Sequence, residues 1–393
     1  MQVSLIHDTC GRVFMKVTII ADVLGEENNG TTTACMNLVR YLQDCGDEVK
    51  IVCCDADKKG WENYYIVKTF NMGPLINKII ERNNVALANP ETAVIEEAIK
   101  DADIVHIMMP FALGRKAVKL AKKRNIPVTS GFHVQAENFT SHIGMMNFGL
   151  ANYVTYMTFY ETVYKKMNGI HYPTQFIRDL FENTVRHKTN GYVISNGVHD
   201  RFKKKKSVRP EELKDKFVIL FTGRYSREKS HHILIKAVAK SKYKDKIQLI
   251  FAGQGPNYNA LRKLSIKKNI NMPIMKFFDK DELAKVINYC DLYCHPAEIE
   301  IEAIACLEAI SCGIVPVIAN SKRCATKAFA IDEKNLFKCN DTQDLADKID
   351  YWIEHPEERR QRSKEYLSYT KQFNQTECMK KMRLMMEECI RNN

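Results

Sequence analysis

Two acidic residues in the C-terminal half, Glu300 and Glu308, have the types and spacing to bind a polar ligand. Residues 301–312 form an apolar stretch that ends at Gly313 and has the pattern of a helix followed by a buried strand. Glu308 falls among apolar neighbours at helical spacing, where an unpaired carboxylate is costly. Glu300 lies near the helix N-terminus, where free backbone N–H groups attract anions. Two carboxylates beside an anion site suit a ligand with hydroxyls and phosphate, such as a nucleotide sugar.

A simpler interpretation of the same stretch stays open. Glu298, Glu300 and Glu302 would then only complement the helix dipole, and Glu308 would pair with a basic residue elsewhere in the chain. The stretch alone does not choose between the two.

Cations and glycines follow two further predicted strands. The apolar run 217–222 leads into Gly223, Arg224 and Lys229, and the run 248–252 leads into Gly253 and Gly255. Cations at the carboxyl edge of a parallel sheet, beside the start of a helix, can neutralise a diphosphate. Glycines there allow close backbone approach. Ordinary surface charges are the alternative.

The N-terminal half offers two weaker candidates. Gly30 lies in a loop between the first predicted strand and a helix, but the loop matches neither a Walker A nor a GxGxxG pattern. His133 follows a predicted strand that begins at Pro127, at the end where parallel sheets place functional groups. An isolated histidine is more often structural, and an ordinary capped loop explains Gly30 as well.

Alternating apolar strands and amphipathic helices position these residues. The alternation occurs twice, which predicts two successive parallel-sheet domains of the α/β class, in agreement with a length of 393 residues. We expect an N-terminal domain over residues 15–199, with Met15 as the first residue, and a linker over residues 200–216. A C-terminal domain over residues 217–364 and a final amphipathic helix over residues 365–393 complete the chain.

Composition narrows the partners. A net charge of +12 favours an anionic partner, and a nucleic acid is set aside because the lysine run 203–206 lacks an aromatic or arginine platform. Thirteen cysteines form neither a disulfide framework nor a zinc pattern. No apolar run has membrane-spanning length and no signal peptide is recognisable, so we expect a cytoplasmic protein.

Taken in order, these motifs resemble glycosyltransferase family 4, whose members are retaining enzymes of GT-B fold. The resemblance covers nearly the whole chain from Met15, and its specific part is Glu300, Glu308 and the following run to Ile318. It implies two Rossmann-like domains that face a cleft and a C-terminal helix that crosses back to the first domain. It also implies a nucleotide-sugar-dependent hexosyltransferase that uses neither a metal nor another cofactor.

The resemblance assigns roles to individual residues. Arg224 and Lys229 would hold the diphosphate, Glu300 the donor sugar, and His133 would lie near the transferred sugar. The donor-binding set is Gly30, Gly223, Gly253, Gly255, Ile304 and Glu308, with Glu308 on the ribose hydroxyls. The chain departs from the family at residues 301–303, Ile-Glu-Ala, where an aromatic residue and then glycine are usual.

The acceptor is predicted from charge and aromatic content. The basic run 115–124 and the aromatic run 153–160 could form a face that rests on anionic lipid, although a solvated helix and a core helix explain them equally well. The resemblance includes members similar to diacylglycerol glucosyltransferases, which are commonly basic proteins peripheral on a membrane. The hypothesis is therefore transfer of a glucose-like hexose to a lipid or glycolipid, by an enzyme peripheral on the inner face of the plasma membrane.

Three alternatives remain at this point. The first is a soluble transferase with a polysaccharide or small-molecule acceptor, and the second a non-catalytic nucleotide-sugar binding protein. The third, an epimerase of the same fold, would need an acid and base set that the sequence does not show. The sugar, the base and the oligomeric state are not specified by the sequence.

Overall fold

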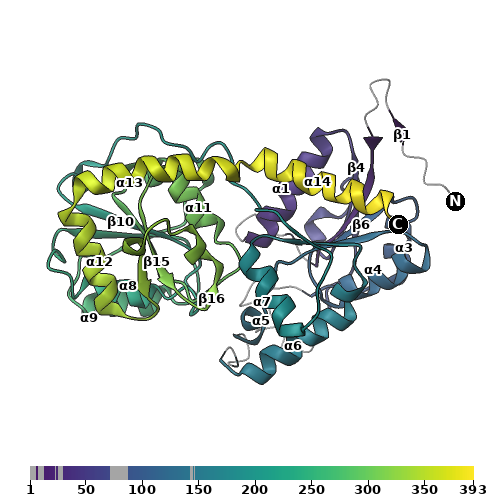
Figure 1. The fold of residues 1–393 in the computed structure, drawn as a ribbon, viewed down its shortest axis with the longest axis horizontal. Coiled ribbons are helices and arrows are strands. Elements are labelled where there is room, and N and C mark those ends of the chain that lie inside the picture. Colours follow the sequence, from purple (N-terminus) through teal and green to yellow (C-terminus); the bar gives the residue numbers. More distant parts are fainter. Residues whose placement is uncertain are drawn as a thin grey trace. The chain divides into compact units, whose positions relative to one another are not determined.

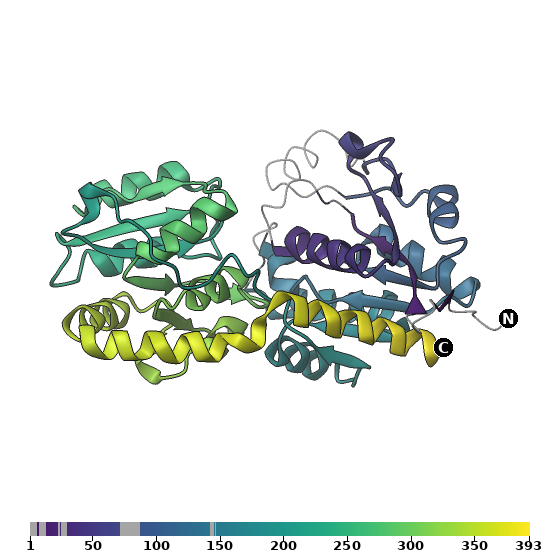
Figure 2. The ribbon, with the colours of Figure 1, turned by 90° about the horizontal axis from the view of Figure 1, so that it is seen from above.

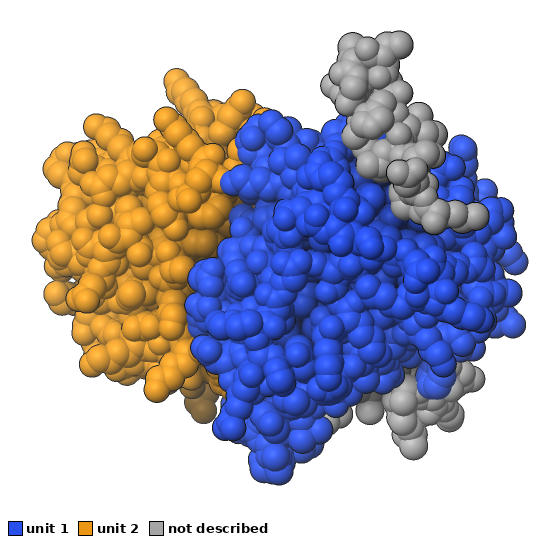
Figure 3. All heavy atoms as spheres, turned by 45° about the vertical axis from the view of Figure 1, so that its right-hand side comes forward, with its two compact units in different colours: residues 1–196, 376–393 blue, residues 197–375 orange. Residues whose placement is uncertain are grey.

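The structure is a computed structural model that describes residues 6–7, 13–22, 24, 30–70, 87–141, 145 and 147–393. The chain divides into two compact units, each built around a parallel sheet (Figures 1 and 3). Unit 1 comprises Met1–Asn196 and Thr376–Asn393, and unit 2 comprises Gly197–Gln375. The predicted α/β class with two parallel sheets is confirmed.

The sheet of unit 1 has seven strands in the order β5-β4-β3-β6-β7-β8-β9, and each neighbouring pair is parallel. Its central strands are buried on both faces, as is typical of a sheet covered by helices on both sides, although they include polar residues such as His106 and His171. The strands are β3 (Lys16–Ile20), β4 (Glu48–Cys53), β5 (Tyr64–Ile66), β6 (Ile104–Ile107), β7 (Val128–Gly131), β8 (Gly169–Tyr172) and β9 (Gly191–Val193). A short hairpin of β1 (Ile6–His7) and β2 (Val13–Phe14) precedes them.

Helices connect these strands, because a parallel pair needs a crossover that returns the chain to the same end of the sheet. At the start of α7, the Thr174 hydroxyl accepts a hydrogen bond from the Ile177 backbone N–H at 3.3 Å, a typical N-cap. The helices of this part are α1 (Gly30–Asp44), α3 (Thr92–Ala98), α4 (Ala112–Lys123), α5 (Ala136–Ser141), α6 (Gly149–Thr162) and α7 (Gln175–Val185), with 3₁₀ turns η1 (Ala56–Lys58) and η2 (Tyr164–Lys166).

The sheet of unit 2 has six parallel strands in the order β12-β11-β10-β13-β15-β17. A separate parallel pair, β14 with β16, follows β13. The strands are β10 (Phe217–Thr222), β11 (Ile247–Ala252), β12 (Ile274–Lys276), β13 (Leu292–His295), β14 (Ile299–Glu300), β15 (Pro316–Asn320), β16 (Arg323–Cys324) and β17 (Leu336–Lys338).

Aspartates begin two helices of unit 2. Asp279 caps α10 and Asp341 caps α12, each by accepting hydrogen bonds from two backbone N–H groups of the first turn. The helices are α8 (His231–Val238), α9 (Tyr258–Lys267), α10 (Lys280–Tyr289), α11 (Ile304–Ser311), α12 (Thr342–Glu354) and α13 (Pro356–Tyr369), with 3₁₀ turns η3 (Glu211–Leu213), η4 (Ala325–Phe329), η5 (Glu333–Asn335) and η6 (Thr370–Phe373).

The last helix, α14 (Gln375–Arg391), belongs to unit 1 although it follows unit 2 in the chain (Figure 2). Its apolar face carries Met379, Met382 and Met386, which are buried in the same core as Met15 and Val17 at the start of β3. The predicted return of the C-terminal helix to the first domain is thus observed. Methionine suits this role because its unbranched side chain fills irregular gaps.

A buried ion pair holds α14 against unit 1. The carboxylate of Asp47, fully buried, accepts hydrogen bonds from Arg383 Nε at 2.8 Å and Nη2 at 2.9 Å and from the Met15 backbone N–H at 3.0 Å. Removal of one partner from such a pair leaves an uncompensated buried charge, which is expensive.

The unit boundaries differ in place from the predicted domain boundaries. The segment that we predicted as a linker is attached to unit 2, where the Lys205 N–H donates to Asn288 Oδ1 at 2.7 Å and Arg209 pairs with Asp291 at 2.9 Å. At the other end, Tyr366 is fully buried in the core of unit 2, so α13 stays with that unit and the returning segment begins at Thr376.

Replacing Arg383 with methionine should lower the free energy of unfolding of unit 1 by about 3 kcal/mol, because the Asp47 carboxylate loses its charged partner. Urea denaturation followed by circular dichroism measures the change. Arg391→Met, at the exposed end of the same helix, is the control and should change the value by less than about 0.5 kcal/mol. Equal stability of Arg383→Met and the wild-type chain would contradict this role of the pair.

Candidate functional site

Three adjacent strands of unit 2 deliver the predicted donor-binding loops to one edge of the sheet. β10 lies between β11 and β13, and the three run parallel, so their carboxyl ends coincide. Gly223 follows β10, Gly253 follows β11, and β14 with Glu300 follows β13. Parallel sheets bind ligands at this edge.

Gly253 and Gly255 allow the loops after β10 and β11 to lie in contact. A Cβ at Gly253 would lie 2.2 Å from the carbonyl oxygen of Gly223, and one at Gly255 would lie 2.7 Å from the backbone nitrogen of Tyr225. Backbone hydrogen bonds join the same loops, from Gly223 to Ala252 at 3.0 Å and from Tyr225 to Gln254 at 2.9 Å. Both glycines are therefore required for packing, whatever contact they make with a ligand.

Lys229 and Glu300 form an ion pair between the loop after β10 and the short strand β14. Their side chains are 22% and 14% exposed, so both charges are largely removed from water. Glu300 also lies 3.5 Å from Nε2 of the buried His295, whose Nδ1 lies 3.2 Å from the Tyr293 hydroxyl. A connected polar series thus runs from Tyr293 through His295 to Glu300 and Lys229.

This series fixes the charges at the sugar end of the predicted site. Burial by itself raises the pKa of Glu300, but the neighbouring Lys229 and His295 outweigh it and lower the pKa to about 2. Burial opposes the charge of Lys229, yet Glu300 raises the pKa of that ammonium above its ordinary value. For His295 burial dominates and lowers the pKa. At neutral pH the set is an anion, a cation and a neutral imidazole.

Arg224 lies in the same loop as Lys229 and is half-buried. Its backbone carbonyl accepts a hydrogen bond from the Ser226 N–H at 2.8 Å, which shapes the turn between β10 and α8. The predicted cations therefore share one loop beside Glu300. Their contact with a diphosphate stays a prediction.

Glu308 lies on α11 with its side chain 7% exposed. Lys280, the first residue of α10, places its Nζ 3.3 Å from Glu308 Oε1. Burial raises the pKa of Glu308, and the charge of Lys280 acts in the opposite direction. The simpler sequence interpretation, in which Glu308 pairs with a basic residue from elsewhere in the chain, is thus confirmed, and contact of Glu308 with a ribose stays a prediction.

The residues in which the chain departs from the family lie where β14 joins α11. Ala303 caps the helix in the left-handed conformation, with φ 64° and ψ 64°, and Ile304 is the first helical residue. Glycine adopts this conformation freely, whereas a residue with a Cβ loses about 1–2 kcal/mol. Ala303 therefore bears backbone strain at the start of α11.

The remaining predicted residues, Gly30 and His133, belong to unit 1. Gly30 begins α1, and a Cβ there would meet nothing within 4 Å, so unit 1 itself does not require glycine at this position. Residues 25–29 of its predicted loop lie outside the described residues. His133 follows β7, and its ring occupies the space that a side chain at Gly131 would need. Their roles toward a donor or acceptor stay predictions.

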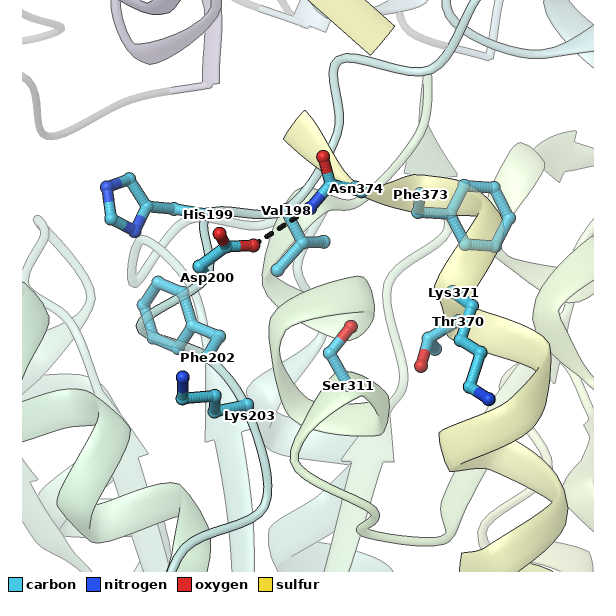
Figure 4. Close-up of a pocket in the computed structure, with 10 residues that line it drawn as sticks. All are labelled: Val198, His199, Asp200, Phe202, Lys203, Ser311, Thr370, Lys371, Phe373 and Asn374. Atoms are coloured by element: carbon cyan, nitrogen blue, oxygen red, sulfur yellow. Dashed lines mark hydrogen bonds between the residues drawn. The ribbon is translucent and has the colours of Figure 1, made fainter. Parts of the chain in front are cut away.

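A cavity of about 330 Å³ lies elsewhere in unit 2, between the segment after Gly197, α11 and η6 (Figure 4). It is lined by Val198, His199, Asp200, Phe202, Lys203, Ser311, Thr370, Lys371, Phe373 and Asn374. A hydrogen bond from Asn374 Nδ2 to Asp200 Oδ1, 2.8 Å long, joins two of its walls. None of the predicted donor-binding residues lines it.

Sequence reasoning missed two polar residues of this site, Lys280 and His295. Neither residue was assigned a role from the sequence. One signal was available for His295, because it ends a predicted strand directly before the acidic stretch. Lys280 reaches Glu308 from another helix, and a contact of this kind leaves no trace in local spacing.

Two family descriptions match the chain. Glycosyltransferase Family 4 matches residues 28–202, and Glycosyl transferases group 1 matches residues 200–367, so the two together span both sheets. The chain belongs to glycosyltransferase family 4. This confirms the family resemblance and the enzyme class expected from the sequence.

Relatives of this glycosyltransferase include two alpha-monoglucosyldiacylglycerol synthases. The protein of Streptococcus pneumoniae is 23% identical over 321 residues, which are 78% of this chain and 71% of the relative. The protein of Acholeplasma laidlawii is 22% identical over 359 residues, which are 87% of this chain and 89% of the relative. A solved structure, Anabaena Alr3699/HepE in complex with UDP and glucose, superimposes with a TM-score of 0.72 at 15% identity, covering 95% of this chain and 100% of that one. Structures of this kind are GT-B glycosyltransferases, which confirms the predicted GT-B fold.

Two Asp-x-Asp pairs of unit 1, Asp55 with Asp57 and Asp101 with Asp103, have the spacing of a metal-binding motif but make internal contacts. Asp101 pairs with Lys50 at 2.5 Å, and Asp103 accepts a hydrogen bond from the Lys16 backbone N–H at 2.8 Å. Asp55 accepts one from the Leu24 N–H at 2.8 Å. Within the described ranges, no cluster of three or more His, Cys, Asp and Glu side chains is arranged to bind a metal ion.

Ala303→Gly should raise the free energy of unfolding of the glycosyltransferase by about 1 kcal/mol, because glycine relieves the left-handed strain while adding some unfolded-chain entropy. The matched control is Ala309→Gly in the interior of α11, which should lower it by about 1 kcal/mol. Thermal and urea unfolding of both variants measure the difference. A loss of stability in Ala303→Gly would contradict the strained cap.

Proposed function

We propose that this glycosyltransferase transfers a glucose-like hexose from a nucleoside-diphosphate sugar to a lipid or glycolipid at a membrane surface, with retention of anomeric configuration. The observation that carries the proposal is the ion pair of Lys229 with Glu300 at the carboxyl edge of the unit 2 sheet, with Arg224 in the same loop. Two cations and the carboxylate that we propose to bind the sugar thus belong to one structural unit.

The donor follows from the charges at this edge. A diphosphate would draw Lys229 and Arg224 toward its oxygens, and Glu300, ionised at neutral pH, would accept hydrogen bonds from sugar hydroxyls. Glu308 would accept hydrogen bonds from the ribose. The structural neighbour HepE is described with UDP and glucose and with UDP-glucose, which supports a nucleotide sugar as donor.

The chemistry would be electrostatic. As the bond between the sugar and the diphosphate breaks, negative charge develops on the leaving group, and Arg224 with Lys229 would stabilise it. Loss of one preorganised charge of this kind costs about 100-fold or more in rate. The chain's own cations fill this role in the proposal, which includes neither a metal nor a cofactor.

The acceptor is proposed from an exposed apolar surface on unit 1. The segment 148–154, at the start of α6, exposes Phe148 by 52%, Leu150 by 63% and Val154 by 53%, whereas Tyr156 and Phe159 of the same helix are buried. Helix α4, whose N-cap residue Phe111 contacts Phe159 of α6, has basic but no acidic residues. Apolar groups beside cations suit an anionic bilayer.

Peripheral attachment fits the remaining observations. Across the part of the chain that the structure describes, no helix is both long enough and apolar enough to cross a membrane. The two alpha-monoglucosyldiacylglycerol synthases among the relatives support a lipid acceptor by their names. The proposed place of action is the inner face of the plasma membrane, where anionic lipids meet the cytoplasmic nucleotide-sugar supply.

Incubation of the chain with labelled UDP- and GDP-hexoses and lipid vesicles should yield a glycolipid, with the retained anomer visible by NMR.

Lys229→Met should lower kcat by about 100-fold or more, because charge on the leaving group is no longer neutralised. Lys240→Met, exposed just after α8, is the control and should keep full activity. Binding of the donor without turnover in the presence of every acceptor tested would contradict an enzymatic function. Transfer to soluble acceptors alone would contradict a lipid acceptor.

The wild-type chain should float with vesicles that contain phosphatidylglycerol, and less with neutral vesicles, because both apolar and charged contacts contribute. The double change Leu150→Ser, Val154→Ser should weaken flotation by about tenfold by removing inserted apolar area. Leu384→Ser, an exposed leucine of α14, is the control and should float normally. Equal flotation of the double variant would show that this surface does not contact lipid.

A further inference from the structure

Lys280, at the start of α10, contacts the buried carboxylate of Glu308 on α11. It is the first residue of α10, which Asp279 caps, and its Nζ lies 3.3 Å from Glu308 Oε1 on α11. The ammonium also lies 5.9 Å from the centre of the Phe202 ring. Its side chain is 41% exposed, so Lys280 meets solvent on one side and Glu308 on the other.

Glu308 depends on this cation more than on any other charge. The largest influence on the pKa of Glu308 is burial, which opposes ionisation. The charge of Lys280 has the next largest effect on this pKa and favours ionisation. Arg201, in the segment before β10, has a smaller effect in the same direction.

Two further titratable groups near Glu308, Tyr293 and Cys312, are held neutral. Burial raises the pKa of Tyr293 on β13 well above its ordinary value, and that of Cys312, just after α11, to about 12. Helix α13 and turn η6 also pack against α11, but Arg362 of α13 is paired with Asp332, and Lys371 of η6 is exposed. Among the described residues, Lys280 is the basic residue that forms an ion pair with Glu308, at 3.3 Å.

We propose that Lys280 is a positioning residue for the donor, which keeps the Glu308 carboxylate charged and oriented to accept both hydroxyl groups of the donor ribose. The inference rests on the proposed function, in which Glu308 contacts the ribose. It extends the site by a residue on α10 that neither sequence spacing nor the family motif had indicated.

The chemistry of a carboxylate explains the requirement. An ionised carboxylate only accepts hydrogen bonds and offers two oxygens to a vicinal diol, whereas a protonated one presents a hydroxyl donor in place of one acceptor. Because burial raises the pKa of Glu308, acidification converts it to the unsuitable form. Removal of Lys280 raises the pKa further, so donor affinity is lost from a higher pH downward.

Calorimetric titration with UDP, and with GDP in parallel, tests the inference on the full chain. Lys280→Met should weaken binding about tenfold at pH 7 and move the acidic fall in affinity upward by about one pH unit. Lys280→Arg should bind within about threefold of the wild-type chain, because it keeps the charge. Lys285→Met, exposed on the same helix, should bind normally.

A ribose-specific readout separates this role from a general structural one. With 2′-deoxyuridine diphosphate, which lacks one of the two hydroxyls, the loss caused by Lys280→Met should shrink to less than about threefold. In a Glu308→Gln background, Lys280→Met should add no further loss, because the charge that it supports is gone.

The outcomes distinguish this inference from the proposed function. Equal UDP affinity and an unshifted pH profile in Lys280→Met would overturn the role of Lys280 and leave the proposed donor intact. The same loss for UDP and its deoxy analogue would also overturn it, because the effect would not pass through the ribose. Failure of the wild-type chain to bind either nucleotide would instead overturn the proposed donor, and the role of Lys280 with it.

Discussion

The ion pair between Lys229 and Glu300 is the interaction on which the architecture of the unit 2 site depends. Two charges that are largely withdrawn from water are stable only when each offsets the desolvation of the other, so the loop after β10 and the strand β14 are held together. His295, at the end of β13, contacts the Glu300 carboxylate, and the Tyr293 hydroxyl contacts the His295 ring in turn. The loop after β10, the end of β13 and β14 are thereby connected through one set of polar contacts.

Backbone geometry sets the shape of this frame as much as side chains do. Gly253 lets the loop after β11 lie against the carbonyl oxygen of Gly223, at a distance that no side chain would allow. Ala303 adopts a left-handed conformation that glycine takes without cost, so α11 begins at a strained residue.

The two glutamates of the site are the same residue type in opposite electrostatic conditions. Glu300 has two close partners that lower its pKa to about 2, and its charge is secure at any physiological pH. Glu308 sits on an apolar helix with one partly exposed cation, and burial raises its pKa. In the proposed function the first holds the sugar and the second the ribose, so the sensitivity of donor binding to pH would reside at the nucleoside end.

The sequence by itself determined the elements and their kind. Alternating apolar runs and amphipathic helices predicted two parallel sheets, and the order of Gly223, Lys229, Gly253, Glu300 and Glu308 predicted which sheet edge carries the donor residues, because such patterns are local. The amphipathic last helix was also visible, since its methionines recur at helical spacing.

Only the tertiary structure decided which residues meet. Lys229, in the loop after β10, pairs with Glu300 of β14. Lys280 of α10 pairs with Glu308 of α11. Asp47 pairs with Arg383, which lies near the other end of the chain. The strain at Ala303 was equally hidden, because a backbone dihedral depends on where the chain must go next. Pairings over long sequence separations arise when sheets and helices pack, and the energy of a buried charge depends on the partner that packing supplies.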